Sequence, residues 1–212
     1  MCPELLRTAT ARAAAEKLSA GGVPTVETSR DVYETLSEKE NPQGIGIVAK
    51  RRLTNLTDID VSRGLCRVAL LRPQDPGNVG TIIRTCDAVG SPGIILVDSA
   101  VDPYDPRSVR ASMGSIFNTE VSWVTAGDFT EWSRRTGCHI VGTSDDAPTD
   151  FRSLTYRRPL VLLMGSEREG LFGHDLATDM VSIPMRGKAD SLNLAVATGI
   201  VLYEVSRQLT AA

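Results

Sequence analysis

Short apolar runs rich in β-branched residues alternate with helical patterns from Cys66 to the end of the chain. This alternation is typical of a parallel sheet that is covered by helices on both faces. We therefore predict an α/β fold with a mostly parallel six-stranded sheet. The predicted strands are Arg67–Leu71, Gly93–Val97, Glu120–Val124, His139–Thr143, Leu160–Met164 and Met180–Ile183. The predicted helices are Asn78–Val89, Pro106–Phe117, Asp128–Thr136 and Leu192–Leu209.

The first 50 residues show a shorter version of the same alternation, with too few apolar residues for a large core of their own. The elements expected there are a helix Thr8–Leu18, a strand Val23–Glu27, a helix Asp31–Ser37 and a strand Gly44–Ala49. Residues 51–62 mix charges with scattered apolar residues and are predicted to be a linker. The predicted organisation is a small α/β unit at 1–50, this linker, and a larger domain at 63–212.

Composition narrows the class of protein further. The 212 residues are 42% hydrophobic, which is enough for a substantial core without a metal or a disulfide. The four cysteines are scattered and form no C-x-x-C pair, which argues against a zinc site and a disulfide framework. The N-terminus lacks the apolar block of a signal peptide, and no apolar run approaches the length of a membrane span. We therefore expect a cytoplasmic protein with no metal and no membrane contact.

Three stretches combine Gly, Asn, Ser or charges with a strand end: Asp75–Gly90, Leu163–Leu171 and Ile183–Glu204. Open α/β sheets bind ligands at such strand ends, so we predict that the three stretches surround one site. In the first of them, Asn78 is expected at or beside a helix N-cap, and Arg84 follows six residues later. The alternative is that Asn78 only caps the helix and Arg84 only solvates it.

The second stretch, LLMGSEREG, brackets a loop between Gly165 and Gly170. Its G-x-x-x-x-G spacing is that of a phosphate loop, but Leu171 and Phe172 stand where Lys and Ser or Thr are required. The loop is therefore not a nucleoside-triphosphate site. Its acidic residues suit a cationic ligand or a sugar hydroxyl better than a phosphate. A plain connection from a strand to a helix is the alternative.

The third stretch places polar side chains at the start of the last predicted helix. Ser191 is predicted to be its N-cap, and Asn193 adds a second polar group in the first turn. The free N–H groups of a helix N-terminus suit a carboxylate or a phosphate. The net charge of −3 means that any nucleic-acid face must be a local patch of basic residues.

Together, NVGTIIRT, LMGSEREGL and IPMRGKADSLNLAVATGI resemble the three motifs of the SpoU or TrmH-type branch of the SPOUT RNA methyltransferases, in order and spacing, from about Cys66 to the C-terminus. The segment VPTVETSRDVYETLSEKENPQGIGIVAK is similar to the second half of this family's small ribosomal-protein-like RNA-binding domain. The first half of that domain is absent, and a native chain that begins upstream of Met1 is one explanation.

The resemblance implies a deep trefoil knot at the C-terminus, a homodimer, and bound S-adenosylmethionine. The cofactor-binding positions that it implies are Thr143, Met164, Gly165, Gly170, Ile183, Met185 and Leu192. The acceptor side, with the catalytic groups, comprises Asn78, Arg84, Glu167, Ser191 and Asn193. Arg72, Arg107 and Arg110 are the candidate RNA contacts.

The activity that the resemblance implies is methyl transfer from S-adenosylmethionine to a ribose 2′-hydroxyl of RNA. A guanidinium has a pKa above about 12 and is a poor general base, so we expect Arg84 to hold an RNA phosphate and stabilise alkoxide charge. The favoured substrate is 23S ribosomal RNA, with antibiotic resistance as one role that the sequence leaves open. The alternatives are a transfer-RNA 2′-O-methyltransferase and a non-catalytic RNA-binding protein. A nicotinamide-dependent oxidoreductase is disfavoured because RPQDPGNVG lacks the G-x-G-x-x-G turn.

The two histidines lie outside the motifs and are predicted to be structural. Neither His139 nor His174 has a carboxylate partner that is evident from the sequence.

Overall fold

The computed structural model describes residues 1–37, 41–166, 168, 170–171 and 176–210, and its contacts divide the chain into two units, Met1–Lys50 and Arg51–Ala212. None of the helices in these ranges is both long and apolar enough to cross a membrane.

The larger unit is built on a parallel sheet in the order β3-β2-β1-β6-β4-β7-β5. All strand pairings described are parallel, and the sheet has seven strands instead of the six predicted. The additional strand is β5, which is two residues long and pairs with β7 at the edge of the sheet. The strands are β1 (Arg67–Leu71), β2 (Gly93–Val97), β3 (Glu120–Val124), β4 (His139–Thr143), β5 (Thr149–Asp150), β6 (Leu160–Met164) and β7 (Asp179–Ser182).

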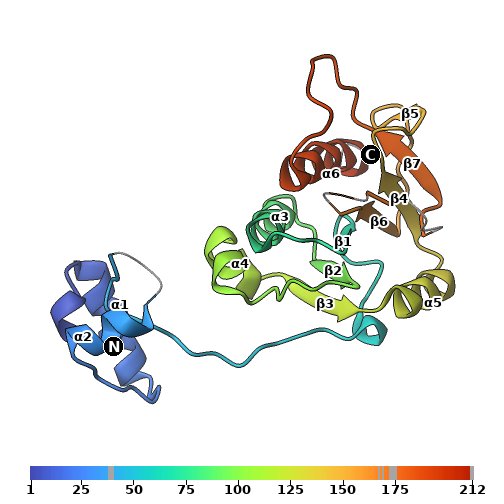
Figure 1. Ribbon diagram of the computed structural model, residues 1–212. Helices are drawn as coiled ribbons and strands as arrows, with labels where there is room; N and C mark the ends of the chain where they lie inside the picture. The colour runs from blue at the N-terminus through green and yellow to red at the C-terminus, as the bar shows by residue number, and fades with distance from the viewer. Residues whose placement is uncertain (38–40, 167, 169, 172–175, 211–212) are drawn as a thin grey trace. The chain divides into compact units, whose positions relative to one another are not determined.

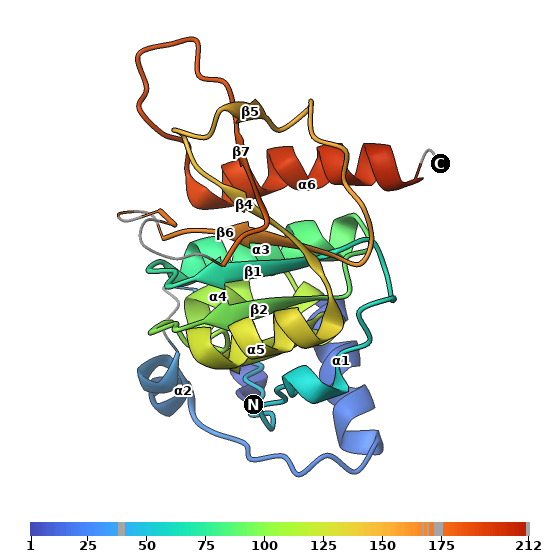
Figure 2. The same cartoon turned by 90° about the vertical axis from the view of Figure 1, so that its right-hand side faces the viewer.

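Helices cover both faces of this sheet, as predicted (Figures 1 and 2). On one face, α3 (Pro76–Ala88), α4 (Pro106–Ala111) and α6 (Leu194–Thr210) lie together, and on the other lies α5 (Ala126–Thr136). Successive side chains of β1 point to opposite faces of the sheet, because side chains alternate along a strand. Val68 and Leu70 join the cluster that contains α3 and α6, whereas Ala69 and Leu71 join the one that contains α5.

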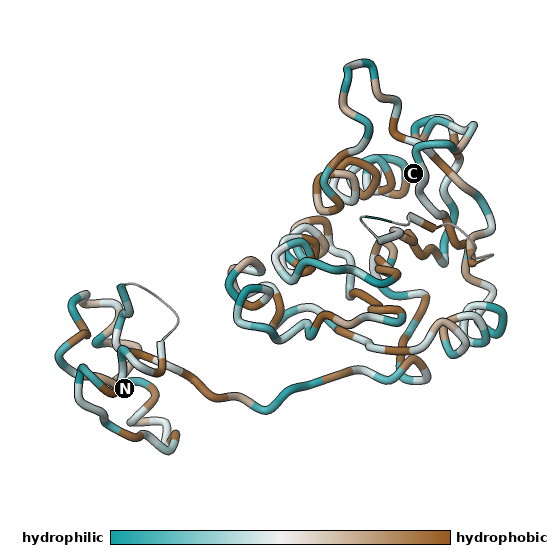
Figure 3. Tube along the Cα trace, viewed as in Figure 1, coloured by the Kyte–Doolittle hydropathy of each residue, from teal (hydrophilic) through white to brown (hydrophobic). Residues whose placement is uncertain are grey.

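Figure 3 shows this pattern as hydrophobic segments in the strands and in the helices that pack on them.

The helix predicted at Pro106–Phe117 is shorter than expected, because Met113 and Gly114 adopt the left-handed backbone values φ 50° and 95°. The remainder is a separate 3₁₀ turn at Ser115–Phe117.

The predicted linker packs on the larger unit. The Thr54 N–H donates to the Val121 carbonyl at 2.8 Å, and the Ser122 hydroxyl donates to the Thr54 carbonyl at 2.7 Å. Ile59 follows a 3₁₀ turn at Leu56–Asp58 and is buried under the α5 face. The contacts therefore assign residues 51–62 to the second unit.

The smaller unit contains α1 (Ala9–Ala20), α2 (Arg30–Leu36) and a 3₁₀ turn at Pro3–Leu5. Both predicted helices are present, but neither predicted strand is. The extended segments are tied to the chain start by isolated backbone bonds, from Met1 to Val26, from Thr28 to Met1 and from Cys2 to Gly44, and the described residues there form no ladder. The buried core is correspondingly small, with Cys2, Leu5 and Tyr33.

Candidate functional site

The three motif segments follow strands that end at the same edge of the sheet. Because all described pairings are parallel, the carboxyl ends of β1, β4, β6 and β7 lie together. The first motif follows β1, the second follows β6, and the third follows β7. This edge is where open α/β sheets bind their ligands, so the fold supports the predicted convergence of the motifs.

The first motif forms the start of α3. Asp75 is the N-cap, since its carboxylate accepts from the Gly77 N–H at 3.0 Å and Pro76 occupies the first helical position. Asn78 is predicted at or beside the cap, and the structure places it beside the cap, in the first turn, so the alternative that Asn78 only caps the helix is excluded. Asn78 is the third residue of the helix and is buried, with 8% of its surface exposed. Its side chain therefore makes a contact other than capping.

That contact comes from the third motif, 115 residues further along the chain. The Asn193 side-chain amide donates to the Asn78 side-chain oxygen at 2.9 Å. The oxygen of Asn193 accepts from the N–H groups of Ala195 and Val196 at 2.9 and 3.3 Å. Asn193 is therefore the N-cap of α6, and the prediction of Ser191 is wrong. Ser191 lies two residues earlier, in exposed chain.

Replacing the two candidate caps separates their roles. We expect Asn193→Ala to lower the free energy of unfolding by about 1–2 kcal/mol, because it removes the cap and the bond to Asn78. Ser191→Ala is the matched control and should change stability by less than about 0.5 kcal/mol. Urea denaturation followed by circular dichroism measures both. Equal losses in the two variants would contradict the assignment of the cap.

The second motif folds into a tight turn after β6. Ser166 and Gly170 exchange two backbone hydrogen bonds, at 3.2 and 3.0 Å. Gly165 has no room for a side chain, since a Cβ there would lie 2.2 Å from the carbonyl carbon of Gly170. Gly170 also adopts a left-handed φ of 57°. Both glycines predicted for the site are required by this turn. Glu167 lies outside the described residues, and so does His174.

The cofactor-side positions on the strands meet beside this turn. The Thr143 hydroxyl at the end of β4 donates to the Met164 sulfur at the end of β6, at 3.5 Å. Met164 is buried, and Ile183 packs partly buried against the core beyond β7. Leu192 is half-buried, whereas Met185 is 38% exposed. These residues offer an apolar floor with one hydroxyl at the carboxyl edge.

The backbone between β7 and α6 leaves hydrogen-bonding groups available. No backbone bond joins residues 183–192 to another part of the chain that the structure describes. Backbone donors and acceptors at a buried or half-buried position need partners, and a ligand with hydrogen-bonding edges supplies them. A sulfonium nucleoside with an adenine ring has such edges. The residues at this edge are therefore compatible with S-adenosylmethionine.

Arg84 lies on the same helix as Asn78 but on another side of it. Six residues correspond to about 600° of rotation and about 9 Å of helix. Arg84 is exposed, whereas Asn78 is buried. Among the described residues, no hydrogen bond or ion pair joins Arg84 to Asn78, Asn193 or any carboxylate. Arg84 is thus exposed on α3, on a different side of the helix from Asn78.

The three arginines predicted to contact RNA lie on the segments beside α3. Arg72 follows β1 directly and is 3.5 Å from the Asp98 carboxylate. Arg107 pairs with Asp105 at 3.3 Å, and its backbone and side-chain hydrogen bonds lower the pKa of that carboxyl. Arg110 is exposed on the same short helix. Two of the three are thus held in place by neighbouring carboxylates.

Helix α4 is fixed firmly against α3. The buried Ser108 hydroxyl donates to the Pro76 carbonyl at 2.8 Å. A Cβ on Gly80 would lie 2.2 Å from the Ser108 carbonyl oxygen, so the two helices touch through their backbones. This contact positions the exposed arginines of α4 beside the helix that carries Asn78. Ser108 could not be identified from the sequence, since a serine within a predicted helix is usually solvated.

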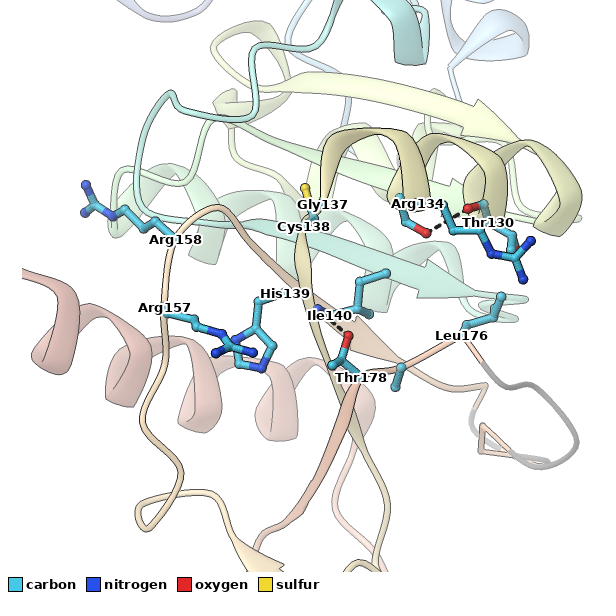
Figure 4. A pocket seen from close by; sticks show the side chains of 12 residues that line it. Thr130, Arg134, Gly137, Cys138, His139, Ile140, Arg157, Arg158, Leu176 and Thr178 are labelled. Carbon is cyan, nitrogen blue, oxygen red and sulfur yellow. Dashed lines mark hydrogen bonds between the residues drawn. The ribbon is translucent and has the colours of Figure 1, made fainter.

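Sequence reasoning also missed a pair at the opposite edge. His139 Nε2 lies 2.7 Å from the Asp179 carboxylate, so this histidine does have a carboxylate partner. It lines a hollow of about 570 Å³ at the amino ends of β4, β6 and β7, shown in Figure 4. None of the motif residues lines this hollow. The motif site and the hollow are therefore separate features of the sheet.

Comparison with known proteins agrees with the motifs. Residues 65–203 match the SpoU rRNA Methylase family. A 23S rRNA (uridine(2479)-2′-O)-methyltransferase from Streptomyces viridochromogenes is 38% identical over 187 residues, which are 84% of this chain and 65% of that protein. The chain thus spans just under two thirds of that relative.

Solved structures show the same similarity. An AdoMet-bound rRNA methyltransferase from Sinorhizobium meliloti has a TM-score of 0.82 and 40% identity, covering 93% of this chain and 77% of its own. The SpoU methyltransferase AviRb from Streptomyces viridochromogenes, in complex with AdoMet, has a TM-score of 0.73 and 31% identity, covering 99% and 97%. The family match covers more than half of the chain, and the sheet that it requires is present. On this basis the chain belongs to the SpoU rRNA methylase family.

Proposed function

We propose that this protein is an S-adenosylmethionine-dependent methyltransferase that acts on a ribose 2′-hydroxyl of RNA. The observation that carries the proposal is the hydrogen bond between Asn78 and Asn193 beside the tight Gly165–Gly170 turn. It joins the first and third motifs next to the second. The family and the 2′-O-methyltransferase relative support the same reaction.

The cofactor is assigned to the carboxyl edge of β4, β6 and β7. When bound, S-adenosylmethionine supplies a methyl group that its own sulfonium charge activates. Thr143 and Met164 would form the floor of the site, beside the close approach of Gly165 to Gly170. Ile183, Met185 and Leu192 bring backbone groups that have no backbone partner among the described residues and can hold the base.

The remaining motif residues would orient the RNA. Asn78 and Asn193 are fixed to each other and would position a ribose beside them. Ser191 is exposed one turn before α6 and can contact the same sugar. Arg84 would hold the phosphate and stabilise negative charge on the oxygen, because a guanidinium stays protonated at any physiological pH. Aligning the hydroxyl with the methyl group is then the main task of the protein.

We infer that the substrate is ribosomal RNA, and specifically 23S RNA. The Streptomyces viridochromogenes relative carries that substrate in its name. Methylation by purified protein with radiolabelled S-adenosylmethionine would test the inference on 23S, 16S and transfer RNA. We expect label in 23S RNA and a new reverse-transcription stop at low nucleotide concentration. Label in transfer RNA alone would make the substrate wrong, and no label in any RNA would favour a binding protein without catalysis.

The same experiment bears on the physiological role. A stop that maps to a nucleotide contacted by a ribosome-targeting antibiotic would support a part in resistance. Residues 1–50, by their likeness to a ribosomal-protein-like domain, are proposed to help capture the RNA. We place the protein in the cytoplasm, where ribosomal RNA is found.

We also propose a homodimer, with α6 at its interface. Val196, Ile200 and Tyr203 are 51%, 37% and 59% exposed and follow helical spacing along one face of α6. Large apolar side chains in such a row mark an interaction surface, and the row begins directly after the Asn193 cap. A second copy is the occupant that places another set of motif residues beside this site.

The dimer is tested by a charge in the middle of the row. We expect Ile200→Asp to give a monomer in sedimentation-velocity runs, because a carboxylate cannot be buried there without a partner. Thr155→Asp is the control, since Thr155 is exposed on another segment. The α6 interface would be contradicted if the Ile200→Asp variant remained a dimer. It would also be contradicted if the Thr155→Asp variant dissociated into monomers.

The C-terminal knot is proposed as well. The supporting geometry is that the chain leaves β7, loops out through residues 183–193, and returns to place Asn193 on Asn78 of the first crossover helix. True knots are rare in proteins, so this part of the proposal depends on the family.

A further inference from the structure

The hollow at the amino edge of the sheet is formed by segments that precede three strands. Residues of α5, the start of β4, the chain before β6 and the chain before β7 surround a volume of about 570 Å³ (Figure 4). The edge lies opposite to the motif site, because all described strands run parallel. Whatever binds here does not occupy the site of methyl transfer.

The charged residues that line this hollow are all arginines. Arg134, Arg157 and Arg158 line it, and no lining residue is acidic. All three are exposed, and none of them forms an ion pair or a side-chain hydrogen bond with a described residue. By contrast, Arg72 and Arg107 beside the motif site are paired with carboxylates. A chain with a net charge of −3 thus places three unpaired arginines around this hollow.

A buried histidine contributes to the wall of the hollow. His139 is 6% exposed, and its Nε2 lies 2.7 Å from the Asp179 carboxylate. The carboxylate accepts from Nε2–H, which leaves Nδ1 as the second polar atom of the ring. That atom is buried and has no partner among the described residues. Buried polar atoms are normally hydrogen-bonded, so this unprotonated acceptor leaves a place for a hydrogen-bond donor, such as a water molecule, in the wall of the hollow.

The side chains are arranged around the start of β4. In the view of Figure 4, Arg157 extends toward the ring of His139, whereas Arg158 extends away from it and Arg134 projects from α5. The Thr178 hydroxyl accepts from the Ile140 N–H at 3.4 Å and ties the β7 side of the hollow to β4. A guanidinium group binds phosphate strongly because its planar N–H donors can form two parallel hydrogen bonds with two phosphate oxygens.

A covalent role for the cysteine in the wall is disfavoured. Burial raises the pKa of the Cys138 thiol, and the Thr136 hydroxyl donates to its sulfur at 3.3 Å. Nucleophilic cysteines have a lowered pKa instead. The hollow therefore offers no activated cysteine nucleophile.

We propose that the hollow between α5 and the amino ends of β4, β6 and β7 binds a phosphate group, with Arg134 and Arg157 as its main ligands. The phosphate comes either from the backbone of the RNA, away from the reacting ribose, or from a free phosphate-bearing small molecule. The RNA source depends on the proposed function, whereas the free source does not.

The first experiment titrates the full-length protein with inorganic phosphate and with adenosine 5′-monophosphate. We expect the backbone amide signals of Gly137 and His139 to shift in two-dimensional NMR spectra. The double variant Arg134→Gln, Arg157→Gln should weaken this binding by about tenfold or more. Arg135→Gln is the matched control, because Arg135 is an exposed neighbour on α5 that does not line the hollow. Unchanged melting temperatures show that all variants fold.

The second experiment measures RNA binding against salt concentration. If the RNA backbone is the source, the double variant should weaken RNA binding and lower the salt dependence by about one or two counterions. If the source is free phosphate, RNA binding stays the same while phosphate binding is lost. Calorimetry with S-adenosylmethionine, run in parallel, reports on the motif site independently. The proposal is overturned if neither phosphate nor RNA shifts the Gly137 and His139 signals, or if Arg135→Gln weakens binding as much as the double variant.

Discussion

Arg84→Ala is expected to reduce methyl transfer to RNA by about 10²- to 10³-fold, because it removes a fixed positive charge from an oxygen that becomes negative during the reaction. Arg84 is exposed on α3 and lies outside the predicted cofactor floor at Thr143 and Met164. The affinity for S-adenosylmethionine should therefore stay the same. Single-turnover assays with radiolabelled cofactor measure the rate, and calorimetry measures the affinity.

Two further variants make this test specific. Arg84→Lys keeps the positive charge but loses the planar set of N–H donors of the guanidinium. We therefore expect its activity to lie between those of the parent protein and Arg84→Ala. Arg135→Ala removes an exposed arginine from α5, on the other face of the sheet, and should leave turnover unchanged. Near-full activity of Arg84→Ala would remove Arg84 from the catalytic group. An equal loss of methyl-transfer rate in Arg135→Ala would mean that the rate depends on the overall positive charge of the protein and not on Arg84 itself.

Gly165→Ala is expected to weaken S-adenosylmethionine binding by about 100-fold. The added methyl group would displace the turn, and a displacement of about 1 Å at a binding site can have an effect of this size. The new Cβ would lie 2.2 Å from the carbonyl carbon of Gly170 and 2.6 Å from the nitrogen of Leu171. Both are backbone atoms, and two hydrogen bonds between Ser166 and Gly170 hold the turn. The turn must therefore move as a whole, away from Met164. Isothermal titration calorimetry with S-adenosylmethionine checks the loss.

The control for this prediction is Gly127→Ala. A Cβ there finds only the Thr125 hydroxyl oxygen, at 3.7 Å, in the first turn of α5. Alanine is also the better helix former, so this variant should be as stable as the parent protein or more so. Cofactor binding that survives Gly165→Ala would separate the turn from the cofactor site. A loss in both variants would instead indicate general destabilisation.

The strands of the sheet could be predicted because their apolar runs are short and are punctuated by turns. β1, β2, β3, β4 and β6 have the predicted bounds. β5 could not be predicted, since Thr149 and Asp150 form no apolar run and become a strand only by pairing with β7. The two N-terminal strands were predicted from similar local patterns, but they found no ladder partner. Tertiary pairing, which the local pattern does not contain, decided both cases.

The site was predictable in outline but not in its contacts. The order of the motifs locates them at one sheet edge, as the parallel fold confirms. The cap of α6 was predicted wrongly and that of α3 was located only approximately, because Asp75, Asn78, Ser191 and Asn193 are all residue types that cap helices. Only the backbone decides which of two neighbours accepts the N–H groups. The pairs Asn78 with Asn193 and His139 with Asp179 join residues far apart in the chain.

The position of β6 between β1 and β4 has a consequence for biosynthesis. The half-sheet β3-β2-β1 can assemble while the ribosome is still translating, but the open side of β1 has to wait until Leu160–Met164 emerges. At about 5–20 residues per second, that interval lasts on the order of 5–20 s. During it the nascent chain carries an unprotected strand edge, which other chains can join. Chaperones that shield such an edge during translation would therefore raise the yield of active enzyme.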